Sequence, residues 1–388
     1  MIGILGIYYN VRNFGAQLQA KALQAAISAY GYGCVWVRYD YRKGIYNPFV
    51  TANIQSEFDG NDGDFWKYYA EQVESELEKR KRAFDFFQDE IPHTAKEYDL
   101  YNLTNVMDEC DRLMIGGDQV WNAFYYMEYP RGIENFTLAF VPKDQVKISF
   151  SASTGGGVLP SEHQKRLALG LKQFDMISVR EKSSVSMIQR LAEQRVTCVL
   201  DSAFLLSQKD WNKIRKDAPS IRNAVYKFAV CCFMGGFVEW RDSSADLCKK
   251  VDVKVLTFPH LGESRYYKAD YGFGDIRDFT SGPAEFLDLI EKAEFIITDS
   301  FHACVFSIIY NKPFYVFLRD ESQRNLKTNG RIEDMLDEFD LTDRIVTPDE
   351  LAQKNEVEPI DYEKVNKIVA VRRQESIDFL KAALKWEK

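Results

Sequence analysis

The sequence predicts an α/β protein that folds into two domains, each built around a parallel β-sheet. Apolar runs of strand length alternate with helical patterns near the N-terminus and again after residue 225. A strand–helix–strand unit places its two strands parallel, because the crossover returns the chain to the same end of the sheet. The chain has 388 residues, which is long for one hydrophobic core and suits two. We expect an N-terminal domain over residues 1–210, a second domain over residues 211–345 and a C-terminal helical segment over residues 346–388.

Composition indicates which kind of partner and which cellular compartment to expect. The formal net charge is -8, with acidic and basic residues interleaved, so nothing favours a nucleic-acid partner. The seven cysteines form no C-x-x-C pair, which predicts reduced, buried thiols in a reducing compartment. The apolar stretch Met1–Ile7 is only of strand length, and no run is long enough to span a bilayer. We therefore expect a cytoplasmic protein without a transmembrane segment.

The first elements form a βαβ unit. Ile2–Ile7 is a buried strand pattern, a helical pattern runs from Gly15 to Tyr30, and Val35–Tyr39 is the second strand. The turn before the helix carries Asn13 and Gly15, and a glycine there lets the backbone approach a ligand. This turn contains neither a G-x-G-x-x-G pattern nor a P-loop, which excludes those two nucleotide-binding motifs.

A second turn has the chemistry of a sugar site. The strand pattern Arg112–Ile115 is followed by two glycines and then by Asp118, Gln119 and Trp121. A carboxylate, an amide and an indole offer planar hydrogen bonding and an aromatic face. The alternative is an ordinary tight turn over a buried tryptophan.

Arg180 and Asp201 each follow a predicted strand. Arg180 comes after Met176–Val179 and beside the start of a helix, where a guanidinium can hold a phosphate or carboxylate through two hydrogen bonds. The alternative is a structural ion pair with Glu181 or another acid. Asp201 closes the strand pattern Val196–Leu200.

The stretch 294–317 combines a strand, a polar turn, a short helix and a second strand. The turn contains Asp299 and Ser300, residue types that favour helix N-caps. Ligands of open parallel sheets bind at the carboxyl ends of strands, beside helix N-termini. His302 lies in the first turn of this helix, where an imidazole can titrate near neutral pH and face an anion. The alternative is a helix-capping or core histidine.

His260 is a second candidate, because it follows the strand pattern Lys254–Phe258. We expect His93 and His163 to be surface residues. No spacing of His, Cys, Asp and Glu is typical of a metal site, so we predict no metal.

Tyr362–Trp386 is a long helical pattern, and in two-domain α/β enzymes such a helix often packs back across the domains.

Four motifs occur in order along nearly the whole chain. They are Asn13-Phe14-Gly15-Ala16-Gln17-Leu18-Gln19, Gly116-Gly117-Asp118-Gln119-Val120-Trp121-Asn122, Ser178-Val179-Arg180-Glu181, and Thr298-Asp299-Ser300-Phe301-His302 with Asn311-Lys312-Pro313. This ordered set resembles the polysaccharide pyruvyl transferase family. The resemblance implies a fold similar to GT-B glycosyltransferases, with two Rossmann-like domains facing a cleft. It also implies transfer of a pyruvyl group from phosphoenolpyruvate onto hydroxyls of a sugar, which forms a ketal, and an acceptor glycan that is lipid-linked or nucleotide-linked.

The resemblance also implies a division of roles. Arg180 and Arg331 would bind the anionic groups of phosphoenolpyruvate, and His302 would be the proton donor or a phosphate ligand. Asp118 would be the acceptor ligand or base. The other residues expected to bind substrate are Asn13 and Trp121 on the acceptor side, and Gly15, Gln119, Asp299, Ser300 and His260. No cofactor is expected besides the donor substrate.

Two other functions compete with this one. A GT-B-like glycosyltransferase that uses a nucleotide sugar would need a base and ribose pocket in the second domain. A non-catalytic carbohydrate-binding relative is favoured by one departure, because family members tend to carry a basic residue two positions before the histidine, where this chain has Ser300. A binding module should keep its affinity for sugar after His302→Ala, whereas a transferase should lose turnover.

Overall fold

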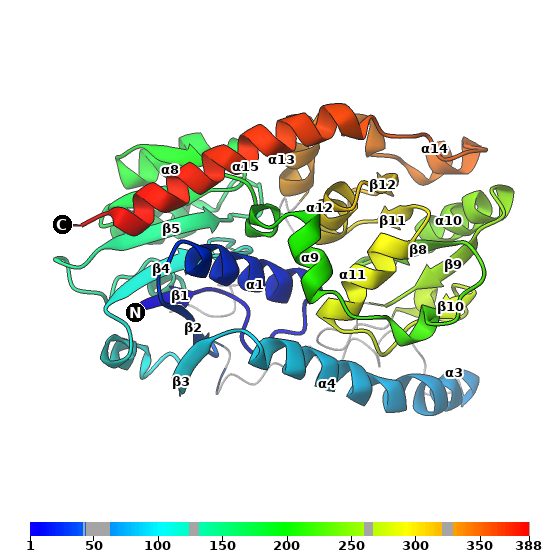
Figure 1. The fold of residues 1–388 in the computed structure, drawn as a ribbon, viewed down its shortest axis with the longest axis horizontal. Coiled ribbons are helices and arrows are strands. Elements are labelled where there is room, and N and C mark those ends of the chain that lie inside the picture. The colour runs from blue at the N-terminus through cyan, green and yellow to red at the C-terminus, as the bar shows by residue number, and fades with distance from the viewer. Residues whose placement is uncertain (42, 44–62, 124–131, 260–266, 320–328, 388) are drawn as a thin grey trace.

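The computed structural model describes residues 1–41, 43, 63–123, 132–259, 267–319 and 329–387. Within these residues the chain forms a seven-stranded and a five-stranded sheet, which lie side by side along the long axis of the molecule (Figure 1). The first sheet contains β1 (Ile2–Leu5), β2 (Cys34–Tyr39), β3 (His93–Tyr98), β4 (Arg112–Gly116), β5 (Lys147–Ala152), β6 (Met176–Val179) and β7 (Val196–Cys198). The second contains β8 (Phe228–Cys232), β9 (Lys254–Thr257), β10 (Ile276–Arg277), β11 (Ile296–Thr298) and β12 (Phe314–Val316).

Both sheets are parallel and doubly wound. The strand order is β3-β2-β1-β4-β5-β6-β7 in the first sheet and β10-β9-β8-β11-β12 in the second. Each order reverses once, between β1 and β4 and between β8 and β11, and such a switch point opens a crevice at the carboxyl ends of the strands. The prediction of an α/β protein with two parallel sheets is confirmed.

Helices pack on the sheets and join them. In the first half of the chain they are α1 (Phe14–Ala29), α3 (Gly63–Tyr68), α4 (Ser75–Asp89), α6 (Gly132–Asn135), α7 (Ser161–Leu171) and α8 (Val185–Ala192). In the second half they are α9 (Gln208–Ile214), α10 (Val238–Lys250), α11 (Pro283–Lys292), α12 (Phe301–Ile309), α13 (Gly330–Glu338), α14 (Pro348–Gln353) and α15 (Tyr362–Lys385). A 3₁₀ turn, η4 (Ser202–Leu205), follows β7, and another, η3 (Lys182–Ser184), follows β6.

Two strands are absent from the sequence-based expectation. β3 and β10 each lie at one edge of their sheet, and β7 and β12 lie at the other edges. β3 has the sequence HTAKEY with three consecutive exposed residues, and β10 is only two residues long. Neither β3 nor β10 has the continuous apolar run of a buried parallel strand, so hydrophobic periodicity does not detect them.

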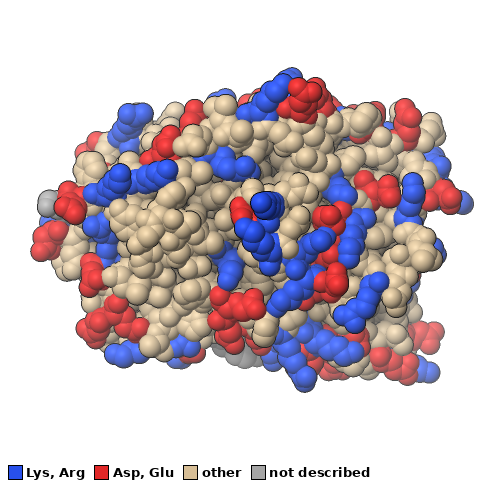
Figure 2. Space-filling model, viewed as in Figure 1, with Lys and Arg blue, Asp and Glu red and all other residues tan. Residues whose placement is uncertain are grey.

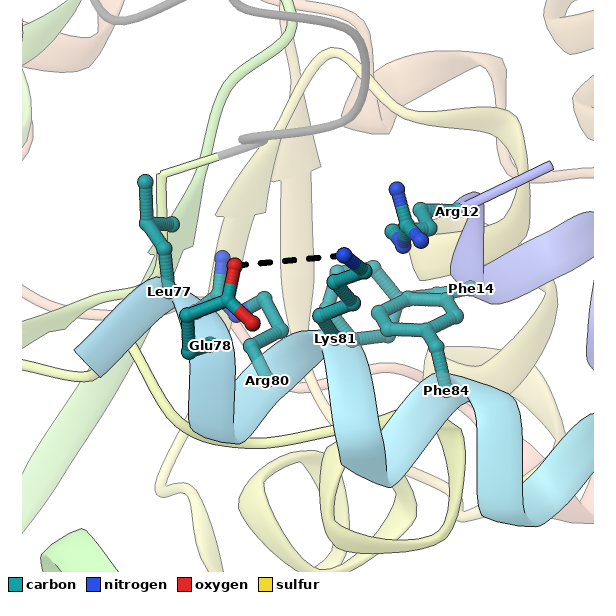
Figure 3. Close-up of a pocket in the computed structure, with 7 residues that line it drawn as sticks. All are labelled: Arg12, Phe14, Leu77, Glu78, Arg80, Lys81 and Phe84. Atoms are coloured by element: carbon teal, nitrogen blue, oxygen red, sulfur yellow. Dashed lines mark ion pairs between the residues drawn. The ribbon is translucent and has the colours of Figure 1, made fainter. Parts of the chain in front are cut away.

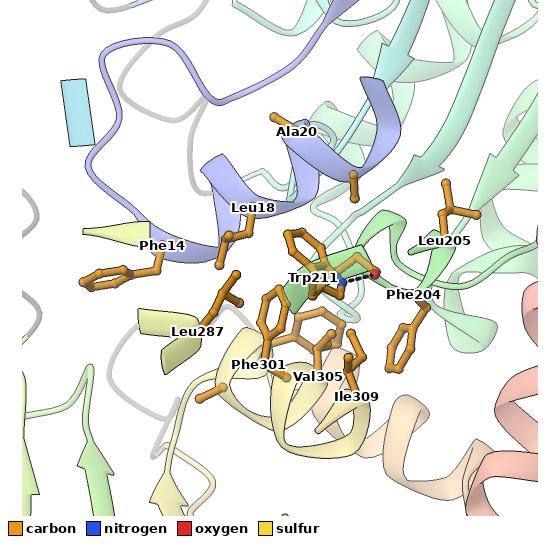
Figure 4. Packing of buried hydrophobic residues seen from close by; sticks show 14 of the residues in the cluster. Phe14, Leu18, Ala20, Phe204, Leu205, Trp211, Leu287, Phe301, Val305 and Ile309 are labelled. Atoms are coloured by element: carbon orange, nitrogen blue, oxygen red, sulfur yellow. Dashed lines mark hydrogen bonds between the residues drawn. The ribbon is translucent and has the colours of Figure 1, made fainter. Parts of the chain in front are cut away.

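One apolar core connects the two sheets. The largest cluster of buried side chains includes Ile4 of β1 and Val230 of β8. Between them, Trp211 of α9 is fully buried near Leu18 of α1 and Phe301 of α12 (Figure 4). The Trp211 indole N–H donates to the carbonyl of Ala203 at 3.0 Å, so the polar atom of this large side chain is satisfied.

The C-terminal helix α15 runs along one side of the molecule and contacts both halves (Figure 1). Near its start, the Tyr362 hydroxyl donates to the carbonyl of Lys312, just before β12. Further along, Ser376 Oγ accepts from the Leu200 amide at 2.9 Å. At its end, Arg112 of β4 donates to the carbonyl of Leu384 at 3.0 Å. The prediction that this helix packs back across the domains is confirmed.

The surface and the cysteines agree with the composition. Lysine and arginine interleave with aspartate and glutamate over the visible face (Figure 2). All seven cysteines are free, and all except Cys198 are buried, as the prediction of small buried thiols requires. Over the part of the chain that the structure describes, no helix combines the length and apolar character needed to cross a membrane.

Candidate active site

The two switch points face each other through residues at strand ends. The turn after β1 leads into α1, whose Gly15 touches the ring of His302 at the start of α12. A Cβ added to Gly15 would lie 2.0 Å from His302 Nδ1. The glycine expected to allow close approach of a ligand therefore allows close approach of the second half of the protein.

Six charged or titratable side chains meet at this junction and are called the interdomain charge cluster. They are Asp118, Arg180, Glu181, Asp201, His302 and Arg331. Every one of them is buried. The first four follow strands of the first sheet, and the last two begin helices that follow strands of the second. Buried charges must be paired, and the pairing here crosses between the two halves.

Arg180 is the centre of the cluster. Its Nη1 donates to Asp201 Oδ2 at 2.6 Å, its Nε donates to Glu181 Oε1 at 3.0 Å, and its Nη2 donates to Asp118 Oδ1. The guanidinium also lies over the ring of Phe301, 4.2 Å from the centroid, a cation–π contact. The structural ion pair that the sequence left as an alternative is therefore present, with three carboxylates.

Two contacts join the halves directly. Arg331 Nη1 donates to Asp118 Oδ1 at 3.2 Å, and His302 Nε2 lies 3.7 Å from Asp201 Oδ2. The second distance is too long for a hydrogen bond, and no described group donates to or accepts from His302 Nε2. His302 thus faces a carboxylate without being hydrogen-bonded to it.

The three carboxyl groups of the interdomain charge cluster have pKa values that are shifted in different directions. Burial alone would raise the pKa of Asp118, but Arg180 and Arg331 outweigh it and lower that pKa to about 2. Asp201 has a lowered pKa as well, because His302 and Arg180 outweigh burial. Burial raises the pKa of Glu181 against the opposing effect of Arg180. The lowered pKa values keep Asp118 and Asp201 ionised at neutral pH.

Four predicted residues have structural partners. Asn13 caps α1 by accepting from the Ala16 amide at 3.1 Å, and Ser300 caps α12. Asp299 is fully buried and accepts from the Met234 amide at 2.6 Å, which fixes the turn after β8.

Gln119 accepts from Asn122 Nδ2 at 2.6 Å. This contact lies within the turn that also carries Asp118.

The structure corrects the expectations for Trp121 and His163. Trp121 is fully buried and donates its indole N–H to the carbonyl of Phe136 at 2.9 Å; its ring offers no face to a sugar, because it fills the core beneath the turn. His163 is also buried, with Nε2 3.1 Å from the carbonyl of Trp121, and is not a surface residue. His260 is outside the described residues.

Glu181 and Asp201 are the members of the cluster to which sequence reasoning gave no functional role. The available signal was their position, since Asp201 directly follows a predicted strand and Glu181 lies two residues after another. In parallel sheets these ends converge on one edge. Across the described residues, no three or more His, Cys, Asp and Glu side chains are arranged to hold a metal ion.

A pocket of about 210 Å³ opens beside the start of α1. Phe14 and Phe84 form its floor, and Arg12 and Lys81 stand over them (Figure 3). Lys81 lies 3.9 Å from Glu78, and Arg12 lies 3.7 Å from an acidic residue of α4. Phe14 is adjacent in sequence to Gly15, so the pocket neighbours the junction that holds His302.

Solved structures share this fold at low sequence identity. UDP-GlcNAc 2-epimerase from Neisseria meningitidis, bound to UDP-GlcNAc, is 12% identical with a TM-score of 0.50, over 98% of this chain and 99% of that one. UDP-GlcNAc 2-epimerase from Methanocaldococcus jannaschii, in complex with UDP-GlcNAc and UDP, is 12% identical with a TM-score of 0.50, over 95% of this chain and 98% of that one. The likeness confirms the GT-B-like arrangement of two domains.

Sequence comparison identifies the family. No curated protein sequence gave a significant match. The profile described as polysaccharide pyruvyl transferase matches residues 13–321. This range contains Gly15 at the start of α1, the Asp118 turn, Arg180, Asp201 and the start of α12, and Arg331 lies ten residues beyond it. The chain therefore belongs to the polysaccharide pyruvyl transferase family.

Proposed function

We propose that this protein transfers the pyruvyl group of phosphoenolpyruvate onto two hydroxyls of a sugar in a polysaccharide or its precursor, forming a ketal. One observation carries the proposal: a buried junction between the two halves brings His302 together with two arginines and ionised carboxylates. Phosphoenolpyruvate carries a phosphate and a carboxylate, which arginines and helix N-termini bind. Its methylene carbon must also receive a proton, for which an imidazolium is suited.

One residue, His302, can serve the proton transfers of this reaction. His302 donates a proton to the methylene carbon, and a sugar hydroxyl attacks the adjacent cationic carbon. The bond from that carbon to the phosphate oxygen breaks, and the second hydroxyl closes the ketal. Of the two hydroxyl protons, one equivalent ends on the new methyl group and the other on the released phosphate. The protein gains and loses none.

The interdomain charge cluster supports separate roles for His302, Asp118 and Arg331. A carboxylate with a pKa of about 2 is a weak base at neutral pH, so the neutral imidazole left after proton donation is the better acceptor of the hydroxyl proton. We assign Asp118 to holding Arg180 and Arg331 in place. Arg180 is engaged by three carboxylates, and Arg331 together with the N-terminus of α12 is the first contact for the donor's anionic groups.

Thermal stability with ligands tests the donor. Phosphoenolpyruvate at 100 times its dissociation constant should add about 2.7 kcal/mol to the free energy of unfolding. UDP and UDP-GlcNAc, tested in parallel, should add nothing. Arg331→Ala should abolish the effect of phosphoenolpyruvate, whereas Arg166→Ala should keep it, because Arg166 only pairs with Glu134 on the surface.

The other outcomes identify the competing functions. Stabilisation by UDP alone would replace the pyruvyl donor with a nucleotide sugar. No stabilisation by any of these ligands, together with binding of glycan that survives His302→Ala, would identify a non-catalytic binding protein. Either result would overturn the proposal.

A further inference from the structure

We propose that Asp201 is the positioning residue for His302, holding the ring across the junction and stabilising its protonated form. Its role in turnover rests on the function proposed above, but the pairing of the two side chains does not. Asp201 is not among the residues expected to bind substrate, and it contacts one of them, Arg180. It would act through His302, so it is not a catalytic residue.

Asp201 is held in place from its own half of the protein. It precedes η4, and its Oδ1 accepts from the Ala203 amide at 2.9 Å. Its Oδ2 accepts from Arg180 Nη1 at 2.6 Å. The side chain is only 2% exposed. Two hydrogen bonds and burial leave this carboxylate one orientation, and in that orientation Oδ2 faces His302.

His302 is held in place from the other half. It lies in the first turn of α12, and its Nδ1 edge packs against the Cα of Gly15. Its Nε2 has no hydrogen-bond partner in the described structure and lies 3.7 Å from Asp201 Oδ2. A nitrogen–oxygen hydrogen bond measures about 2.9 Å, so a small closing movement of the two halves would complete the bond.

The surrounding charges make Asp201 the acid that matters most for the ring. Asp118 also interacts favourably with a positive charge on His302. Arg180 and Arg331, which both lie over the ring of the neighbouring Phe301, oppose such a charge, and Glu181 pairs with Arg180. Asp201 is the carboxylate that faces Nε2 directly. An ionised carboxylate at this distance stabilises an imidazolium, which is the form needed to protonate carbon.

Histidine NMR tests the pairing without any substrate. The sequence has four histidines, so the ring Cε1–H signals are few, and His302→Gln identifies the one of interest. In Asp201→Asn, the pH midpoint of the His302 signal should fall by about one unit relative to the unmodified protein. Glu181→Gln is the matched control, because it also removes a carboxylate from Arg180 but not one that faces the ring. Its midpoint should fall by clearly less.

The proposal fails if the midpoint in Asp201→Asn equals that of the unmodified protein or falls no further than in Glu181→Gln. Should Asp201→Asn not fold, ring ¹⁵N shifts of the unmodified protein decide the matter. Pairing with Asp201 requires the neutral ring to carry its proton on Nε2. A proton on Nδ1 instead would overturn it.

Turnover gives the second readout. Once an acceptor sugar is in hand, Asp201→Asn should lower kcat at least tenfold and leave KM for phosphoenolpyruvate within about threefold, because Asp201 contacts the ring and not the donor. Asp201→Glu, which keeps the charge, should recover part of kcat. If phosphoenolpyruvate proves not to be the substrate, the NMR result still stands or falls by itself.

Discussion

At the scale of single residues, the notable feature is a set of buried charges that no hydrophobic core requires. Arg180 contacts three carboxylates, and Arg331 reaches one of them from the other half of the chain. Buried ion pairs add little net stability, because desolvation offsets the attraction, but removal of one partner is costly. The cluster is therefore better explained by the chemistry of the junction than by stability.

Asp118→Asn should destabilise the protein by about 3–5 kcal/mol, because it removes a buried carboxylate that pairs with both Arg331 and Arg180. Urea unfolding at pH 7 measures this. Glu162→Gln is the control, since Glu162 pairs with Lys165 at 3.6 Å on an exposed helix face, and its loss should cost less than about 1 kcal/mol. A variant of Asp118 as stable as the control would contradict the account of the cluster.

The Asp118 carboxylate should also make the stability of the protein depend on pH in the acid range. Its pKa is about 2 in the folded protein and about 3.9 in an unfolded chain. A carboxyl whose pKa is lowered on folding stabilises the protein above the unfolded value and loses that contribution as the pH falls through the folded value. Between pH 4 and pH 2 the unmodified protein should therefore lose roughly 2 kcal/mol more than Asp118→Asn, as measured by urea midpoints at each pH.

At the scale of elements, helix α13 connects the halves through its first turns. A Cβ on Gly330 would lie 2.0 Å from the carbonyl oxygen of Gly156, in the turn after β5. Asp334 accepts from the Ser183 amide at 2.9 Å. Arg331 lies between these contacts and reaches Asp118. The position of this arginine thus depends on a backbone-to-backbone approach that only glycine permits.

Gly330→Ala should push α13 away from that turn and destabilise the protein by about 1–3 kcal/mol, measured by thermal unfolding. The response to phosphoenolpyruvate should weaken as well, because Arg331 moves with the helix. Gly63→Ala is matched to it, since both glycines begin a helix and no atom of the described residues lies within 4 Å of a Cβ on Gly63. Equal stability of the two variants would mean that the approach of Gly330 to Gly156 is not a tight contact in solution.

The elements also show where sequence reasoning succeeds. Central strands such as β1 and β11 are fully buried, and their apolar runs are visible in the sequence. Ser300 caps the start of α12 as expected, and Asn13, which was expected to bind substrate, caps the start of α1. The edge strands β7 and β12 were also predicted. β3 and β10 escaped detection because β3 carries three consecutive exposed residues and β10 is only two residues long.

At the scale of the whole molecule, the two sheets share one core and one C-terminal helix. Leu380 of α15 is fully buried in the cluster that also includes side chains of β1 and β8. The two halves should therefore unfold together, although multidomain proteins often do not.

Leu380→Ala should lower the free energy of unfolding by about 2–5 kcal/mol, through lost burial and the cavity left behind. The transitions followed by tryptophan fluorescence and by far-UV circular dichroism should shift together. Val371→Ala on the same helix should change little, because Val371 is 60% exposed. Two separate transitions, only one of them moved by Leu380→Ala, would show that the halves are independent.

The sequence by itself determined the class of fold, the order of the motifs and the residue types at strand ends, because hydrophobic periodicity and capping are local properties. It placed His302, Asp118 and Arg180 among the candidates for the same reason. Only the tertiary structure decided which of them meet. Trp121 turned inward because its large apolar ring fills a core that sequence spacing does not describe. Asp201 faces His302 because two strand ends, about 100 residues apart in the chain, converge at one junction.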